Sequence, residues 1–159
     1  GGPAEPWTWL GPPAAVTGPT WGGNLEILQW TLAVGRFVRP VEEYAGSVLV
    51  LETSEELPPA EEIFRMLRNL GERGMLDVAS ALVFGRPPVT DHDHPLEASA
   101  AVASRAERRD AVRRILEEYR PDLPAVLDVD FGHTKPQWLL PYGGPVTVDT
   151  TTRRITAHF

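Results

Sequence analysis

The chain has 159 residues, 42% of them hydrophobic, which is enough for one domain with a core of its own. Its formal net charge of −7 argues against a nucleic-acid polymer as partner, because phosphate backbones bind basic surfaces. Cysteine is absent, which excludes disulfides and thiolate metal ligands. No apolar run approaches the roughly 18 residues that a membrane span needs, and no signal-peptide pattern opens the chain, so we expect a soluble, cytoplasmic protein.

The first part of the chain is rich in Pro, Gly and Trp. Residues 1–6 have the composition of a linker, which suggests a piece of a longer polypeptide. Residues 1–23 are expected to form a loop with one short strand near Trp7–Leu10. Asn24 is then expected to cap a helix that ends at Gly35.

The next part alternates apolar runs with an amphipathic segment. The run Ser47–Glu52 predicts a strand buried on both faces, and Ala79–Phe84 predicts a second short strand. Between them, apolar residues at helical spacing follow Pro58-Pro59 and predict a helix that closes at Gly71 or Gly74.

A second long helix is predicted after a loop. Residues 89–104 show no periodicity and are expected to be a surface loop. The segment Arg105–Arg114 is interpreted as the solvated face of the helix, which ends before Pro121. Its apolar stripe is formed by Val112, Ile115, Leu116 and Tyr119.

The last part predicts strands only. One strand runs to Phe131, another is expected at Gln137–Leu140, and Val146–His158 predicts a hairpin that turns near Thr150–Arg153. Strands that alternate with helices, followed by a hairpin, predict an α/β domain with a mixed sheet.

Two titratable side chains follow predicted strands. Glu52 ends the strand Ser47–Glu52, and His133 lies just after the strand that runs to Phe131. A carboxylate that accepts from the imidazole Nδ1 fixes the tautomer of a general base, so the two predict an acid–histidine pair. Glu55 and Glu56 compete for the acid role from a more polar segment. The purely structural alternative is that His133 satisfies a turn and Glu52 caps the next helix.

The motif Asp91-His92-Asp93-His94 carries potential metal ligands. Consecutive residues in a loop rarely direct three ligands at one ion, so we expect no metal site here. The tryptophans Trp7, Trp9 and Trp21 could stack on a ring-shaped ligand, but packing is the simpler role.

Four motifs occur in order and together resemble one known family. They are Gly22-Gly23-Asn24-Leu25-Glu26, Leu51-Glu52-Thr53-Ser54-Glu55-Glu56, Gly85-Arg86-Pro87, and Phe131-Gly132-His133-Thr134 with its later Leu140-Pro141-Tyr142-Gly143 tail. The chain resembles the C-terminal half of the LD-carboxypeptidase family of serine peptidases, and most closely its microcin C immunity branch. The resemblance covers about residues 7–158, so we take 7–159 as this domain.

The resemblance implies a fold and a catalytic triad. The fold would be a three-layer β/β/α swivelling domain with a mixed sheet. The triad would be Ser–Glu–His, with Glu52 and His133 on this chain and the serine on an N-terminal domain. Asn24, Thr134, Trp9 and Trp21 are candidate residues of the substrate cleft. Relatives are implied to be cytoplasmic homodimers that use neither metal nor organic cofactor.

The nucleophile is where this sequence departs from the family. The family's serine lies in a Gly–aromatic–Ser–Asp turn, and the sequence has no such turn. Its serines at positions 47, 54, 80, 99 and 104 lack the strand–turn–helix setting of a nucleophile elbow. We therefore expect the chain alone to be inactive.

Three functional interpretations stay open. The first is hydrolysis of the amide of a peptidyl- or aminoacyl-nucleotide toxin, with release of D-alanine from a murein tetrapeptide as the alternative within the family. The second is a non-catalytic α/β binding module in which His133 is structural. The third, a metal hydrolase that combines Asp91–His94 with His133, is disfavoured by ligand geometry.

Overall fold

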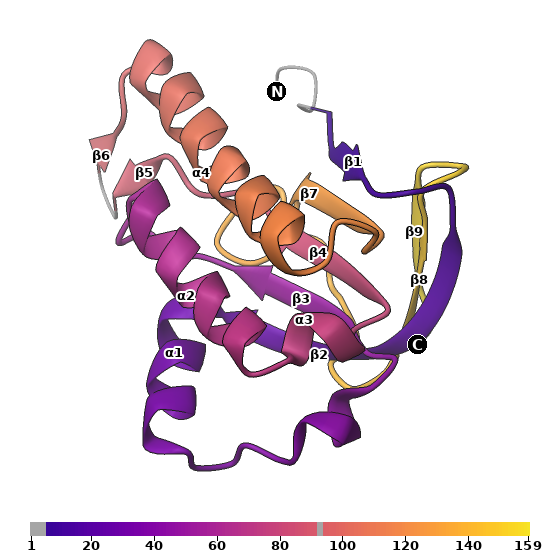
Figure 1. The fold of residues 1–159 in the computed structure, drawn as a ribbon. Coiled ribbons are helices and arrows are strands. Elements are labelled where there is room, and N and C mark those ends of the chain that lie inside the picture. The colour runs from indigo at the N-terminus through magenta and orange to yellow at the C-terminus, as the bar shows by residue number, and fades with distance from the viewer. Residues whose placement is uncertain (1–5, 92–93) are drawn as a thin grey trace.

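The computed structural model describes residues 6–91 and 94–159 (Figure 1). The elements in chain order are β1 (Thr8–Leu10), β2 (Ala15–Asn24), α1 (Leu25–Val34), the 3-10 helix η1 (Val41–Tyr44), β3 (Val48–Glu52), α2 (Ala60–Glu72), α3 (Met75–Val78), β4 (Ala81–Gly85), β5 (Thr90–Asp91), β6 (His94–Pro95), α4 (Ala98–Tyr119), β7 (Ala125–Val129), β8 (Pro145–Asp149) and β9 (Arg154–Ala157).

Seven strands form one mixed sheet in the order β1-β7-β4-β3-β2-β8-β9. The four central strands β2, β3, β4 and β7 are parallel, whereas β1, β8 and β9 pair antiparallel at the two edges. Every residue of β3, β4 and β7 is buried, as their continuous apolar runs require. The carboxyl ends of the parallel strands therefore meet at one edge of the sheet.

Strand β2 corrects the expectation that residues 1–23 are loop with only a short strand. Its second half, Thr20–Asn24, runs parallel to β3, and its first half, Ala15–Pro19, runs antiparallel to β8. The Gly and Pro residues within it lower its intrinsic strand propensity, so the local sequence indicated a loop. Pairing with strands on both sides outweighs that preference.

The fold has three layers, as the resemblance implied. Helices α1, α2, α3 and α4 pack on one face of the central parallel strands. The β8–β9 hairpin continues the same sheet beyond β2 and packs on the other face of β3, β4 and β7 (Figure 1). Alternate residues of β3 divide between the two cores: Leu49 and Leu51 face the helices, whereas Val48 and Val50 face the hairpin. The β/β/α class is confirmed.

Most remaining elements match their expected positions. The Asn24 cap, the helix after Pro59 and the terminal hairpin are confirmed. The expectation that residues 89–104 form a loop is wrong in both halves. The short strands β5 and β6 pair in the first half, and α4 begins at Ala98 with an exposed, alanine-rich turn that shows no apolar stripe. The segment 137–140 is irregular rather than a strand.

Arg108 corrects the interpretation of Arg105–Arg114 as a solvated face. Its side chain is only 3% exposed, Nε donates to the carbonyl of Pro58 at 3.0 Å, and Nη1 donates to the carbonyl of Pro88 at 3.0 Å. It thereby joins the segment after β3 to the segment after β4. The position continues the apolar stripe of α4, since Val112 and Ile115 follow at i+4 and i+7. Within the described ranges, no helix has the length and hydropathy that crossing a bilayer demands.

Candidate active site

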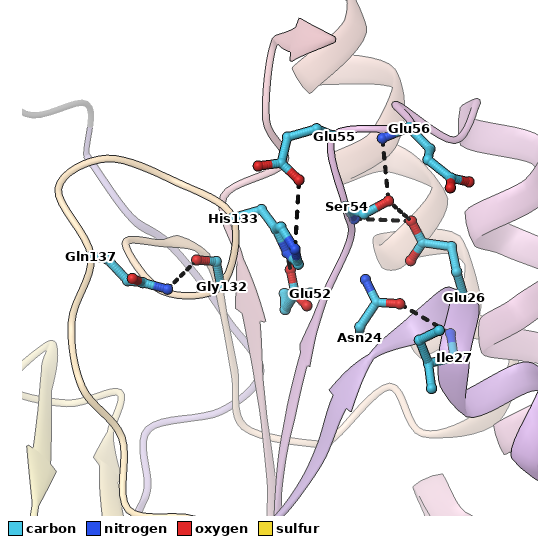
Figure 2. A network of polar contacts seen from close by, with 10 residues as sticks. All are labelled: Asn24, Glu26, Ile27, Glu52, Ser54, Glu55, Glu56, Gly132, His133 and Gln137. Atoms are coloured by element: carbon cyan, nitrogen blue, oxygen red, sulfur yellow. Dashed lines mark hydrogen bonds and ion pairs between the residues drawn. The ribbon is translucent and has the colours of Figure 1, made fainter. Parts of the chain in front are cut away.

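The candidate site lies at the edge where the parallel strands end. Asn24 and Glu52 are the last residues of β2 and β3, and they are register partners. Gly85 ends β4, and the loop after β7 brings His133 to the same edge. Four segments distant in sequence thus meet there, which is where α/β sheets commonly mount functional groups (Figure 2).

The structure brings Glu52 and His133 into direct contact. The His133 Nδ1 lies 2.6 Å from Glu52 Oε2. Because a carboxylate only accepts, this contact assigns the proton to Nδ1 and leaves Nε2 as the acceptor of the neutral ring. The carboxylate is buried, whereas the imidazole side chain is 39% exposed. Glu52 does not cap the next helix, whose N-cap is Pro59.

Glycine next to the histidine permits this contact. A Cβ on Gly132 would lie 2.6 Å from both Cγ and Oε2 of Glu52, and its φ of +81° is a conformation that favours glycine. A Cβ on Gly85 would likewise lie 2.8 Å from the Cβ of Glu52. The Glu52 side chain therefore fits between two glycines of the motifs noted in the sequence.

An ion pair fixes the start of the histidine loop. Asp130 accepts from Arg86 Nε at 2.9 Å and from Trp7 Nε1 at 3.0 Å. Arg86 is buried, and it follows β4 just as Asp130 follows β7. Neither Arg86 nor Asp130 was predicted to be a site residue. Their opposite charges after two apolar runs were the signal available.

Glu55 lies on the other side of the imidazole. Its Oε2 is 3.5 Å from His133 Nε2, so Figure 2 shows the ring between two carboxylates. Ser54 holds this segment, because its backbone N–H and its hydroxyl both donate to the buried Glu26 Oε1, at 2.9 and 2.8 Å. Glu55 thus contacts Nε2 and not Nδ1, while Glu56 contacts neither nitrogen through any interaction found in the described residues.

The surrounding carboxylates raise the pKa of His133 above its ordinary value of 6.5. Burial is the largest single influence and lowers this pKa, because it disfavours the charged ring. The hydrogen bond to Glu52 and the negative charge of that residue act in the opposite direction and, with the charges of Glu55 and Glu26, they outweigh burial.

This raised pKa predicts a pH dependence of stability. The stabilising contribution of His133 should be fully present below about pH 6.5 and lost as pH rises through the higher folded-state pKa. We expect the melting temperature of the chain to fall more between about pH 6 and pH 8 than that of a His133→Gln variant. Thermal melts of both proteins in matched buffers measure this, and parallel curves would contradict it.

The other candidate cleft residues divide into two groups. Asn24 lies at the site edge, where its Oδ1 caps α1 by accepting from the Ile27 N–H at 3.0 Å, and Thr134 lines a pocket together with His133. Trp9 packs against Trp7, with ring centroids 6.1 Å apart, and Trp21 packs against Tyr44 at 4.7 Å. Neither Trp9 nor Trp21 lines the pockets beside His133 or Glu52.

Two residues of the motif Asp91–His94, 92 and 93, lie outside the residues that the structure describes. Among the residues that are described, no group of three or more His, Cys, Asp or Glu side chains could hold a metal ion.

The comparisons with known proteins identify the family. A family model described as the LD-carboxypeptidase C-terminal domain matches residues 17–148. The chain belongs to this family. The family takes its name from the LD-carboxypeptidases, which are peptidases. No curated protein matches the chain significantly.

Solved structures share the fold of the domain. An MccF-like protein from Streptococcus pneumoniae, solved in complex with AMP, has a TM-score of 0.71 and 25% identity over 94% of this chain and 43% of its own. The microcin C7 self-immunity protein MccF, in complex with aspartyl sulfamoyl adenosine, has a TM-score of 0.70 and 20% identity. That match covers 94% of this chain and 39% of MccF. An MccF-like protein from Bacillus anthracis str. Ames has a TM-score of 0.68 and 18% identity, over 94% of this chain and 41% of its own. The domain spans less than half the length of these proteins.

Proposed function

We propose that this domain supplies the glutamate and histidine of a Ser–Glu–His triad in an amide-hydrolysing serine peptidase. The observation that carries the proposal is the 2.6 Å contact between His133 Nδ1 and Glu52 Oε2, at the carboxyl-end edge of the parallel strands. In this role Glu52 orients the ring and stabilises the imidazolium that forms during the reaction. The serine would come from an N-terminal domain, which we propose as the partner.

The proposed reaction uses the free nitrogen of the ring. His133 Nε2 removes the proton from the serine hydroxyl as the oxygen attacks the amide carbon, and then gives that proton to the leaving nitrogen. In the second half of the reaction, water takes the place of the leaving amine: His133 Nε2 removes a proton from water as it attacks the acyl carbon, and then returns that proton to the serine oxygen. This domain would contribute only the proton transfers, because the attacking oxygen and the oxyanion donors would belong to the proposed partner.

For the substrate we propose a peptidyl- or aminoacyl-nucleotide, cleaved at the amide next to the nucleotide. Support comes from structural neighbours that were solved with AMP and with aspartyl sulfamoyl adenosine. The second candidate is a murein tetrapeptide that loses its terminal D-alanine, and the family description as LD-carboxypeptidase favours it. The homodimer and the cytoplasmic location implied by the resemblance stay predictions.

The test is hydrolysis by the domain assembled with a serine-bearing N-terminal domain, in one polypeptide or mixed. We expect release of the amine from an aminoacyl-nucleotide or a tetrapeptide, and loss of that activity in His133→Ala. Neither the domain alone nor the partner alone should be active. Full activity of the assembled His133→Ala protein would favour the non-catalytic binding module instead.

A further inference from the structure

Trp7 contacts both ends of the loop that carries His133. At the start of the loop, the indole Nε1 of Trp7 donates to Asp130 Oδ2 at 3.0 Å. At its end, the Trp7 ring packs edge-on against Trp138, with centroids 4.7 Å apart. The backbone N–H of Trp138 donates to the carbonyl of Asp130 at 2.6 Å and closes the loop. One side chain from outside the site therefore contacts both points between which the imidazole is held.

The strand before this loop is distorted at Asp128. The register between β4 and β7 shifts just before the loop, and Asp128 has a φ of +64°. A residue with a side chain keeps this left-handed conformation only where surrounding contacts hold it. Asp128 is 1% exposed, and its carboxylate accepts from Arg109 Nε at 2.7 Å and from Thr8 Oγ1 at 3.1 Å. This irregularity turns the chain towards the site, and Thr8 helps to hold it.

Trp7 and Thr8 belong to a short segment at the edge of the sheet. Strand β1 has three residues, and its partner among the described strands is β7. Trp7 precedes the strand and is half-buried against the core on the hairpin side. The two side chains therefore connect this edge with Asp130 and Asp128, which lie on either side of the last residue of β7.

The position of the loop determines where the His133 ring lies. The ring is 39% exposed and is bound by two carboxylates, Glu52 at 2.6 Å and Glu55 at 3.5 Å. A general base exchanges protons with atoms within about 2.6–3.2 Å of it. A misplacement of about 1 Å can lower the rate about a hundredfold. Contacts that hold the ends of the loop therefore matter for Nε2, although they lie away from the reacting atoms.

We infer that Trp7 is a positioning residue of the proposed triad, because its contacts with Asp130 and Trp138 keep the His133 ring against Glu52. The inference rests on the proposed function and deepens it. Trp7 lines neither of the pockets beside the acid–histidine pair. Its replacement should therefore change kcat rather than KM.

The first test removes the indole N–H and keeps an aromatic ring. Trp7→Phe should lower kcat of the assembled enzyme about ten- to a hundredfold, with KM within about twofold. Trp9→Phe makes the same change in β1, at a ring whose aromatic contact is with Trp7 rather than with the loop, and should leave kcat within about twofold. Equal losses of kcat in the two variants would overturn the inference.

The second test needs no serine, because it follows the His133 ring by NMR in the 159-residue chain. Burial lowers the pKa of His133, but the contact with Glu52 and the neighbouring carboxylates raise it by more, so that it lies above 6.5. Trp7→Phe should weaken the contact with Glu52, and the pKa should fall toward 6.5. Trp9→Phe should leave the titration curve unchanged. An unchanged curve in folded Trp7→Phe would mean that Trp7 supports the edge strand alone.

Trp138→Ala decides the question in case Trp7→Phe does not fold. Trp138 is 45% exposed, and its replacement removes the ring against which Trp7 packs. We expect a lower kcat and a lower pKa of His133, and a double variant with Trp7→Phe that loses less than the two single losses combined. Unchanged kcat and pKa in Trp138→Ala would contradict the inference. Absence of hydrolysis by the unaltered assembled enzyme would instead count against the proposed function, while the NMR titration would still decide the role of Trp7.

Discussion

Replacing Glu52 by glutamine is expected to lower kcat of the assembled enzyme by about 10³–10⁴-fold while leaving the domain folded. The amide of glutamine is close in size to the carboxylate, but it carries no charge and its NH₂ group can donate to Nδ1. It would then favour the tautomer in which Nε2 holds the proton and cannot act as a base. The negative charge that raises the pKa of His133 is also lost, so that pKa should fall.

The rival acid provides the matched control for this substitution. Glu55→Gln removes a carboxylate at the same ring, but on the Nε2 side and at 3.5 Å rather than 2.6 Å. Its effect on kcat should be far smaller than that of Glu52→Gln. Steady-state kinetics of both variants, with NMR titration of the His133 ring, make the comparison. A larger loss of kcat in Glu55→Gln than in Glu52→Gln would reverse the assignment of the acid.

Replacing Gly132 by alanine is expected to displace the Glu52 carboxylate from the imidazole. The new methyl group would lie 2.6 Å from Oε2 and from Cγ, distances that real Cβ contacts do not show. The positive φ costs about 1–2 kcal/mol for a residue with a side chain, and overpacking adds about 1–3 kcal/mol. We expect a lower melting temperature, a lower pKa of His133 and a loss of kcat of about 10³-fold or more in the assembled enzyme.

Gly46→Ala separates the backbone effect from the clash. Gly46 has a φ of +76°, and a Cβ there would meet nothing within 4 Å. This variant should lose stability through its backbone alone, and the pKa of His133 should stay unchanged. If Gly132→Ala and Gly46→Ala gave the same His133 titration curve, displacement of Glu52 would be the wrong explanation.

Much of the site edge could be predicted from the sequence because its parts follow strong apolar runs. Glu52 directly follows such a run, and the carboxyl ends of parallel strands share an edge, so a partner from another strand was expected. The Asn24 cap was predicted for a similarly local reason, since a short polar side chain before an apolar helix can accept from its free N–H groups. Both predictions began from a polar residue that lies directly beside an apolar run.

The parts that could not be predicted depend on contacts between distant segments. Strand β2 has glycines and prolines that indicate a loop, and only its pairing with β3 and β8 makes it a strand. Arg108 belongs to an Arg-rich helix, and its burial depends on two carbonyls contributed by other loops. The position of Glu55 beside Nε2 depends on Glu26, which lies 28 residues from Ser54 in sequence. No pattern of neighbouring residues predicts such contacts between distant segments.

The antiparallel direction of β1 has a consequence for how a catalytic partner could be attached. Because Thr8 pairs with Leu127 and Leu10 pairs with Ala125, β1 enters the sheet at the end where β7 leaves for the His133 loop. The indole of Trp7, just before β1, donates a hydrogen bond to Asp130 at the start of that loop. A polypeptide joined ahead of β1 would therefore be attached at the same edge of the sheet as the His133 loop. Such a tether would give an attached hydroxyl nucleophile a high effective concentration there, even if the contact between the two domains were weak.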